Sequence, residues 1–189
     1  FYYRNKDLQS ENTDGTVFEG QKSGFEYESE PDVNLGGPIV KDKIWFFISG
    51  SQQKSEEYLP GYPYDKQPDN TALDLDSPAL YAKITTQLGR NDRVTLSYNY
   101  SDYKRNHRSA SILFTEDVSR KQETPNHVFQ GQWTHFQGTN FVSNLKFAYM
   151  DYNLNLYAKN DSPRIYDRTD RLYTGSYGYD DLYTRRRFQ

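Results

Sequence analysis

The side chains that could carry catalysis or bind a metal are few in this sequence and poorly spaced for either task. The three histidines, His107, His127 and His135, lack the spacing of a zinc site. Asp180 and Asp181 are adjacent, so a strand would point their carboxylates to opposite faces and prevent joint acid–base work. No Ser-His-Asp or Cys-His set, P-loop, HExxH or dinucleotide motif is present. We therefore predict no catalytic residue, no cofactor site and no enzyme activity.

One polar stretch offers oxygen ligands for a cation. Asp69, Asp74 and Asp76, together with Asn70, carry the carboxylate and carbonyl oxygens that Ca²⁺ prefers. Their spacing is not that of an EF-hand loop, and acidic loops of this kind are usually only solvated. We therefore predict no metal ligand among them.

The composition indicates β-structure with one wet face. Only 34% of the 189 residues are hydrophobic and the mean hydropathy is −1.02, yet 16% are aromatic. Disordered chains are poor in aromatic residues, whereas transmembrane barrels combine a polar interior with aromatic girdles at both membrane interfaces. The sequence has no apolar run of about 18 residues, so no transmembrane helix is predicted. The absence of cysteine excludes a disulfide scaffold, and the net charge of −3 gives no reason to expect nucleic acid.

Three tight turns recur between apolar strand ends, in 36–43, 88–94 and 136–141. Their centres, Asp42, Arg90 and Gly138, lie about 48 residues apart each time, as in repeated hairpins. The flanking segments alternate between apolar and polar residues, as half-buried strands do. The apolar sets are Leu80, Ala82, Ile84 and Leu88; Val94, Leu96, Tyr98 and Tyr100; Phe129 and Trp133; and Phe141, Leu145, Phe147 and Tyr149.

Near Tyr149 the alternation changes phase. The apolar set after this point is Met150, Tyr152, Leu154 and Leu156. Two explanations stay open: a β-bulge, or a strand that leaves the membrane there.

Long polar connections join the other ends of the strands, at about 6–22, 57–75, 107–124 and 159–178. Compact soluble domains rarely carry several such loops, whereas outer-membrane barrels have short periplasmic turns and long outer loops. The predicted fold class is therefore all-β, an antiparallel up-and-down transmembrane β-barrel, of which residues 1–189 supply about eight strands. Neither end looks closed, and an open edge in lipid would leave backbone groups unpaired. We expect a partial barrel domain, a fragment of a larger barrel.

Alternation also sorts the polar side chains by face. The candidate lumenal residues are Tyr81, Lys83, Asn99 and Asn144. Of the three arginines 185–187, alternation places Arg185 and Arg187 on one face, where lipid contact at mid-depth would cost about 2–4 kcal/mol each. We expect these arginines to face the lumen or to lie above the membrane, where they could bind anionic lipopolysaccharide or a partner.

One segment closely resembles a known family. Residues 33–47, Val-Asn-Leu-Gly-Gly-Pro-Ile-Val-Lys-Asp-Lys-Ile-Trp-Phe-Phe, are similar to the first periplasmic turn of TonB-dependent receptors. The likeness is strongest to the Oar-like subgroup, which carries a carboxypeptidase-regulatory-like domain before the plug. Residues 1–12 resemble the first barrel strand and outer loop of that subgroup, and 77–106 are similar in pattern. The resemblance implies a barrel of about 22 strands around a separate N-terminal plug.

The same segment has a physical interpretation. Gly36 and Gly37 permit a positive φ or a close backbone approach, Pro38 fixes the turn, and Asp42 lies in water between two lysines. Aromatic side chains then enter the membrane interface: Trp45, Phe46 and Phe47. An ordinary hairpin of a soluble sheet is the alternative, because a run of apolar residues beside a charged turn also suits a buried strand.

Three functions remain as hypotheses. The first, which the resemblance implies, is a TonB-dependent transporter that contributes barrel wall and extracellular loops to energised uptake across the bacterial outer membrane. Its partners would be outer-membrane lipid, the rest of the barrel with its plug, the TonB energy-coupling complex acting through the N-terminal part, and a surface lipoprotein or other outer-membrane protein. The second is an outer-membrane scaffold, adhesin or secretion component. The third is a soluble carbohydrate-binding β-sandwich.

Overall fold

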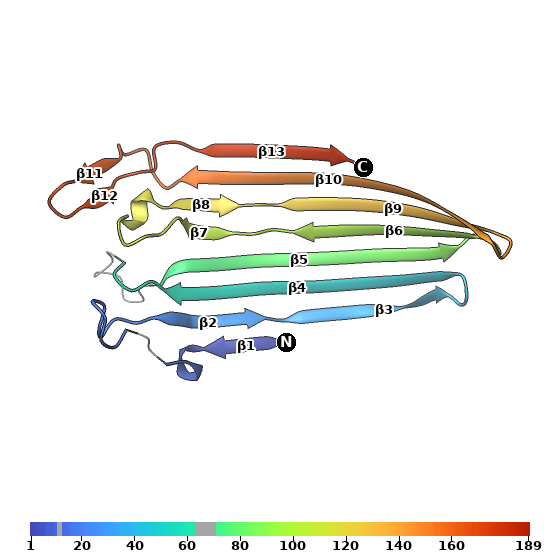
Figure 1. The fold of residues 1–189 in the computed structure, drawn as a ribbon, viewed down its shortest axis with the longest axis horizontal. Coiled ribbons are helices and arrows are strands. Elements are labelled where there is room, and N and C mark those ends of the chain that lie inside the picture. Colours follow the sequence, from blue (N-terminus) through green and yellow to red (C-terminus); the bar gives the residue numbers. More distant parts are fainter. Residues whose placement is uncertain (11–12, 63–70) are drawn as a thin grey trace.

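A computed structural model describes residues 1–10, 13–62 and 71–189 of the chain. The described part is built almost entirely from antiparallel strands, with a large sheet of eleven strands and a separate two-stranded hairpin (Figure 1). Only two single 3₁₀ turns, η1 (Lys6–Leu8) and η2 (Glu116–Val118), interrupt this pattern in the described residues. Within these ranges, no helix is long and apolar enough to cross a membrane.

The strands follow one another through the sheet as a meander. The order is β1-β2-β4-β5-β6-β9-β10-β8-β7, with β3 also pairing with β4 and β13 with β10. Their bounds are β1 (Tyr2–Asn5), β2 (Gly24–Glu30), β3 (Asp32–Val40), β4 (Ile44–Tyr58), β5 (Thr71–Gln87), β6 (Asp92–Ser101), β7 (Arg105–Arg108), β8 (Arg120–Glu123), β9 (Asn126–Gln137), β10 (Phe141–Ala158) and β13 (Asp181–Phe188), with β11 (Ile165–Asp167) and β12 (Leu172–Thr174) forming the hairpin.

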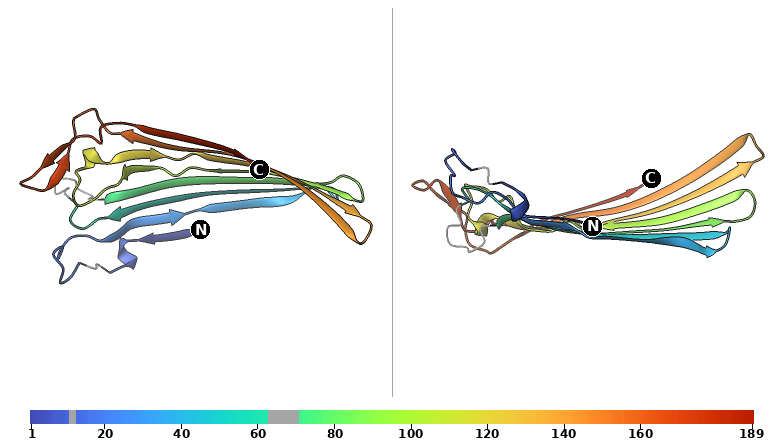
Figure 2. Two further views of the ribbon diagram at one scale, coloured as in Figure 1. Left: turned by 45° about the horizontal axis from the view of Figure 1, so that its top comes forward. Right: turned by 90° about the horizontal axis from the view of Figure 1, so that it is seen from below.

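Three pairs of strands continue one another along a single line. β2 and β3 both pair with β4 and are separated only by Pro31. In the same way, β8 and β9 both pair with β10. β7 continues the line of β6 and lies beside β5. The eleven strands therefore form eight long lines, the number that the sequence predicts. The all-β antiparallel class is confirmed. The sheet is open, however, with β1 and β3 along one edge and β13 along the other (Figure 2).

The three predicted turns are confirmed and lie together at one end of the sheet, while the long connections gather at the other (Figure 1). Each turn contains a residue with a left-handed backbone: Asp42 at φ 60°, Gly89 at φ 110° and Gly138 at φ 64°. Aspartate and glycine tolerate this conformation better than other residues, which explains their place in these turns.

The Gly-Gly-Pro segment was expected to form the first turn, and that expectation is wrong. Gly36, Gly37 and Pro38 lie inside β3, paired with Phe47, Phe46 and Trp45, and the chain reverses at residues 41–43. Neither glycine has a positive φ. The other interpretation, a close backbone approach, fits Gly36, because a Cβ there would lie 3.1 Å from the Phe46 carbonyl oxygen and 3.1 Å from Phe47 Cδ2.

The change of phase along β10 is not caused by a bulge. β10 pairs with β9 from Phe141 to Tyr152 and with β13 from Tyr149 to Leu156, and neither pairing shifts register. The strand is thus regular, and its apolar residues pass from one face of the sheet to the other. Such a change indicates that each face meets different surroundings at the two ends of the strand: the face that is in contact with apolar groups at one end is not the same face at the other end.

The half of the sheet near the turns is a single layer without a core. Seen edge-on in Figure 2, it is one thin fan of strands, whereas the loops thicken the other end. The buried apolar side chains of the described residues, Tyr58, Val118 and Leu156, all lie towards that loop end. Apolar side chains near the turns therefore need a partner other than the described chain.

The two adjacent glycines of β3 give a matched test of this packing. Gly36→Ala is expected to destabilise the β3–β4 hairpin by about 1–3 kcal/mol, since the added methyl presses on the Phe46 carbonyl and the Phe47 ring. Gly37→Ala is the control, because nothing lies within 4 Å of the Cβ it would add. Urea unfolding of the full-length protein in detergent measures both. Equal stability of the two variants would contradict the observed packing.

Candidate functional site

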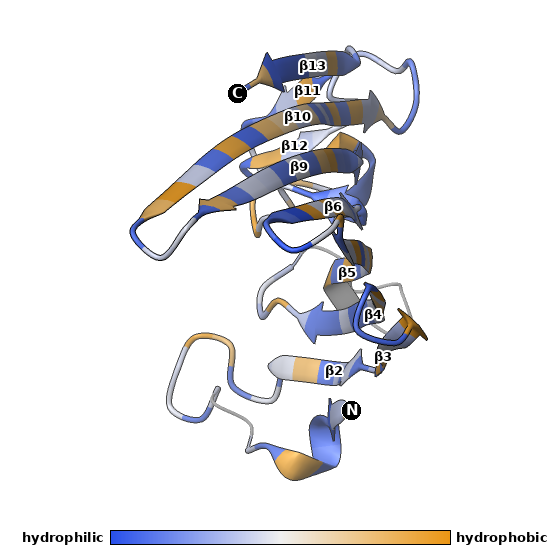
Figure 3. Ribbon diagram, turned by 90° about the vertical axis from the view of Figure 1, so that its right-hand side faces the viewer, coloured by the Kyte–Doolittle hydropathy of each residue, from blue (hydrophilic) through white to orange (hydrophobic). Residues whose placement is uncertain are grey.

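The pairing of strands β4, β5, β6, β9 and β10 gives the sheet two different faces. Directly paired residues in a sheet project to the same side. One register row reads Phe46, Ile84, Leu96, Gly131 and Phe147, and the adjacent row, on the other side, reads Phe47, Lys83, Ser97, Gln130 and Ala148. We name the first side the apolar face and the second the polar face. Figure 3 shows the resulting alternation of hydropathy along β9 and β10.

The apolar face is large and uncovered. Leu96 exposes 54% of its surface, Leu145 65% and Phe147 52%. These residues sit on neighbouring strands, so they form one continuous patch rather than scattered exposed side chains. A soluble protein rarely leaves an apolar patch of this extent in water, and such a patch marks contact with a partner or a membrane.

Aromatic rings border this patch on the side of the loops. Tyr98, Phe129, Tyr149 and Phe188 occupy one register row of four strands. Their ring centroids are 4.6 Å apart for Tyr98–Phe129, 6.4 Å for Phe129–Tyr149 and 4.8 Å for Tyr149–Phe188. One row further from the turns, this face carries an ion pair instead, with Arg186 Nε 3.5 Å from Asp151 Oδ2.

The patch also ends in aromatic and polar groups near the turns. Trp133 Nε1 donates to Asp92 Oδ1 at 2.9 Å, and His135 Nδ1 lies 2.8 Å from the same oxygen. From the Trp133 row to the Tyr98–Phe129 row the strands advance four residues, or about 14 Å at about 3.4 Å per residue. Aromatic rings thus stand at both margins of the patch, as aromatic girdles flank the taller apolar band, about 25 Å, of outer-membrane barrels.

The four predicted lumenal residues all lie on the polar face. Tyr81 pairs directly with Asn99, Lys83 follows Tyr81 by two residues, and Asn144 pairs with Thr134. Asn144 Oδ1 accepts hydrogen bonds from Thr134 Oγ1 at 2.8 Å and from the side-chain amide of Gln132 at 3.2 Å. Their grouping on one side follows the predicted alternation, and their lumenal position remains a prediction.

A hollow of about 530 Å³ opens on this polar face. Its polar lining includes Tyr81, Thr95, Ser97, Gln130, Gln132 and Lys146. Gln130, Gln132 and Lys146 were not selected from the sequence, although the alternation of their strands already places them on the side of Lys83. These hydrogen-bond donors and acceptors suit the binding of a polar molecule.

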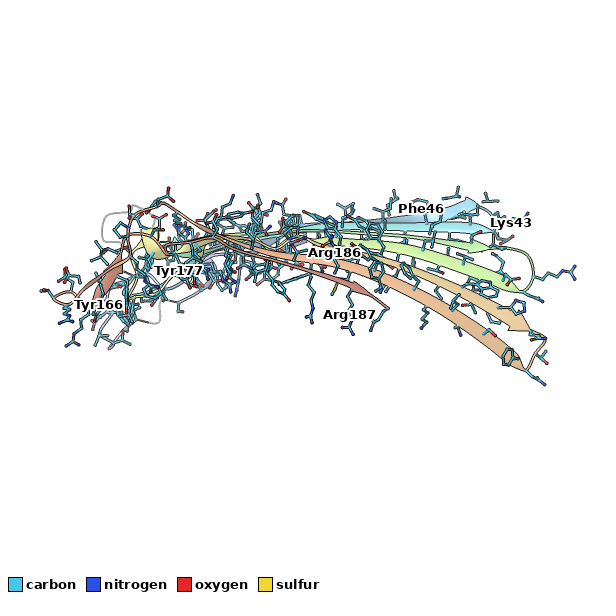
Figure 4. The ribbon with its side chains drawn as sticks, turned by 90° about the horizontal axis from the view of Figure 1, so that it is seen from above. Lys43, Phe46, Tyr166, Tyr177, Arg186 and Arg187 are labelled. Carbon is cyan, nitrogen blue, oxygen red and sulfur yellow. The ribbon has the colours of Figure 1, made fainter. Side chains whose placement is uncertain are left out.

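The predicted interface aromatics do not share one side. Phe46 lies on the apolar face, whereas Trp45 and Phe47 lie on the polar face. There the Phe47 ring centroid is 6.1 Å from that of Tyr81, and Lys83 Nζ is 5.9 Å from the Phe47 ring centroid. Figure 4 shows Phe46 and Arg187 on opposite sides of the sheet. Arg187 pairs with Met150 and Arg185 with Tyr152, so both arginines are on the polar side, as alternation predicts.

At the loop end, His107 and its partners link three of the connections between strands. His107 Nδ1 lies 3.1 Å from Asp74 Oδ1, and Nε2 lies 3.0 Å from Glu116 Oε1, which also accepts from Lys159 Nζ at 2.8 Å. Hydrogen bonding to Asp74 raises the pKa of His107. Asp74 also accepts from the backbone N–H of Asn106.

These contacts use the oxygens that the calcium hypothesis required. Asp74 is engaged by His107, and Asp76 accepts from the Gln52 side-chain amide at 2.9 Å. Asp69 and Asn70 lie outside the described residues. Among the residues that the structure does describe, no group of three or more acidic, histidine or cysteine side chains is placed to hold a metal.

The remaining candidates for chemistry are engaged in structural contacts. His127 Nδ1 lies 2.9 Å from the Tyr98 hydroxyl at the aromatic border of the patch. Asp180 Oδ1 accepts from the backbone N–H of Ala158 at 2.7 Å, and Asp181 Oδ2 lies 4.0 Å from Arg120. These long-range partners could not be read from residue spacing, because each contact joins separate strands or loops.

Comparison with known proteins found no relative of this chain. No protein-family model matches the chain, and no curated protein or solved structure matches it either. The site therefore has to be interpreted from its own geometry.

The two faces predict opposite responses to the same substitution at neighbouring positions. Ile84→Arg places a charge in the apolar patch and is expected to lower assembly of the full-length protein by the equivalent of about 2–4 kcal/mol. Thr85→Arg is the matched control on the polar face and is expected to assemble normally. Quantitative blotting of the assembled protein in the membrane fraction measures both. Equal losses would refute the assignment of the faces.

Proposed function

We propose that this chain forms part of the wall of a transmembrane β-barrel in the bacterial outer membrane, and that its parent is a TonB-dependent transporter. The observation that carries the proposal is the two-faced, single-layer meander, with an exposed apolar band bordered by aromatic rings on one side and polar side chains on the other. Lipid can cover the first side and water the second, which is the division found in membrane barrels.

The arrangement of the connections gives the proposal a direction. The three tight turns stand at one end and the long connections at the other (Figure 1). Outer-membrane barrels place short turns in the periplasm and long loops outside the cell. We assign the residue 41–43 turn to the periplasm and the loops around His107 and Lys159 to the cell surface. With the apolar face against lipid, the polar face becomes the lumenal side.

Both edges of the sheet need a neighbour within a membrane. No described strand pairs with the outer edge of β3 or of β13. An unpaired peptide group in lipid costs several kcal/mol, so both edges are paired in the proposed barrel, and we assign further strands of the same barrel to this role. This agrees with the larger barrel of about 22 strands that the resemblance implies, in which a plug fills the lumen.

Transport, rather than a passive wall, is supported by the resemblance of residues 33–47 to TonB-dependent receptors and by the polar hollow on the proposed lumenal face. Energy would reach the barrel from the inner-membrane complex through TonB and the plug. A surface lipoprotein or another outer-membrane protein would meet the loops. The substrate would contact the loops and polar-face side chains such as Tyr81, Lys83 and Asn99.

Two other functions have weaker support. A surface scaffold, adhesin or secretion component would use the same barrel wall, and it differs in having no energised uptake. A carbohydrate-binding β-sandwich needs two sheets packed face to face. The described residues instead form one large sheet with an uncovered apolar face and a hairpin of three-residue strands. The sandwich therefore leaves the apolar band unexplained.

Solute depletion from the growth medium tests transport for any ligand, because every solute in the medium is followed at once. The wild type is compared with a strain that lacks the parent gene and with one that lacks TonB. We expect at least one solute to disappear from the wild-type medium and to remain with both mutants, and a plasmid copy of the gene to restore its uptake in the first. If the wild type and the gene deletion deplete the same solutes at the same rate, the scaffold alternative is favoured.

A further inference from the structure

Three arginines meet on β7 and β8 at the loop end of the sheet. Arg108 and Arg120 are direct cross-strand partners, and Arg105 is the partner of Gln122. Gln122 also pairs with Leu156 of β10, which places these side chains on the polar side of the sheet. We name Arg105, Arg108 and Arg120 the arginine cluster.

The charges of the arginine cluster are incompletely matched. Like charges directly opposite each other in a sheet are destabilising. Arg120 forms an ion pair with Asp181, but the distance from Arg120 Nη1 to Asp181 Oδ2 is 4.0 Å, the upper limit for such a pair. Glu57 interacts electrostatically with Arg105, and burial raises the pKa of Glu57. Among the described residues, neither Arg105 nor Arg108 has a carboxylate oxygen within 4.0 Å, whereas Arg120 has that of Asp181.

The hydrogen-bonding capacity of the cluster is also only partly used. The Nε atoms of Arg105, Arg108 and Arg120 are all shielded from water and have no hydrogen-bond partner, and the Arg120 side chain is only 10% exposed. A buried charged donor without an acceptor is costly, so most such groups in proteins are paired. Three such donors on the paired strands β7 and β8 give this part of the polar face more hydrogen-bond donors than acceptors.

Aromatic rings pack against two of these guanidinium groups. Arg120 Cζ lies 3.8 Å from the Tyr177 ring centroid, and Arg105 Cζ lies 4.9 Å from that of Tyr103. Tyr177 lies at the loop end of the sheet (Figure 4). A guanidinium packed on a ring can still direct its terminal Nη groups away from the ring edge, and paired N–H groups of this kind bind carboxylate and phosphate oxygens. Gln122 Oε1 accepts from Arg108 Nη1 at 2.5 Å and restrains the third arginine.

We propose that the arginine cluster is a binding site for an oxyanion, a phosphate or carboxylate group carried by a solute that enters from the loop end. The site faces away from the apolar patch, so lipid head groups around the barrel do not reach it. The inference rests on the proposed function for its lumenal position and deepens it, because it makes the transported substrate anionic. It adds a second contact region beyond the polar hollow nearer the turns on the same face.

Calorimetric titration of the full-length protein in detergent tests the site with two probes, pyrophosphate and citrate. Binding of the first alone assigns phosphate, binding of the second alone assigns carboxylate, and binding of either supports the proposal. Arg108→Gln and Arg120→Gln are each expected to weaken the binding about tenfold or more, since each removes a charge-assisted contact. Arg120→Lys keeps the charge but lacks the planar fork, and it should also bind more weakly than the wild type.

The matched control is Arg168→Gln, an exposed arginine in the turn between β11 and β12, which should bind as the wild type does. Only variants that keep the heat-sensitive gel mobility of the wild type are compared, so a folding defect is not counted as a lost contact. Absence of binding by a wild-type protein that does run as a barrel overturns this inference and leaves the barrel intact. An equal loss in Arg168→Gln would also overturn it.

Discussion

The two-residue period of the strand, carried across the sheet by in-register pairing, is the constraint on which the rest of the structure depends. Because β4, β5, β6, β9 and β10 pair without slipping near the turns, each row of side chains stays on one face of the sheet from strand to strand. A slip of one residue would move Lys83 and Lys146 into the apolar patch. The turns at Asp42, Gly89 and Gly138 fix that register, and the two faces follow from it.

The aromatic row of Tyr98, Phe129 and Tyr149 divides the sheet into two zones with different partners. Towards the turns the chain has no core of its own, and its apolar side chains require lipid in our proposal. Towards the loops the apolar residues of β10 change sides, Leu156 is buried, and ion pairs and stacked arginines hold the connections together. The half of the sheet near the turns thus depends on its surroundings for packing partners, whereas the loop end packs against other parts of the same chain.

Structural features that depend on the local pattern of residues could be predicted from the sequence. Alternation identified the eight strand lines and the faces of Lys83 and Asn99, and turn residues located all three hairpins. The Gly-Gly-Pro segment misled, because glycine and proline mark turns but also tolerate the edge strand in which they lie here. Contacts such as His107 with Asp74 and Glu116 join distant loops, and no periodicity encodes them.

The central claim is that the polar face lines a closed barrel whose apolar band lies in the outer membrane. Its most direct test is the gel mobility of the full-length parent, extracted in mild detergent from the outer-membrane fraction and run with and without boiling. A closed membrane barrel resists the detergent until it is boiled, so the account predicts a faster-running band in the unboiled sample. A water-soluble protein whose mobility does not change on boiling would contradict it.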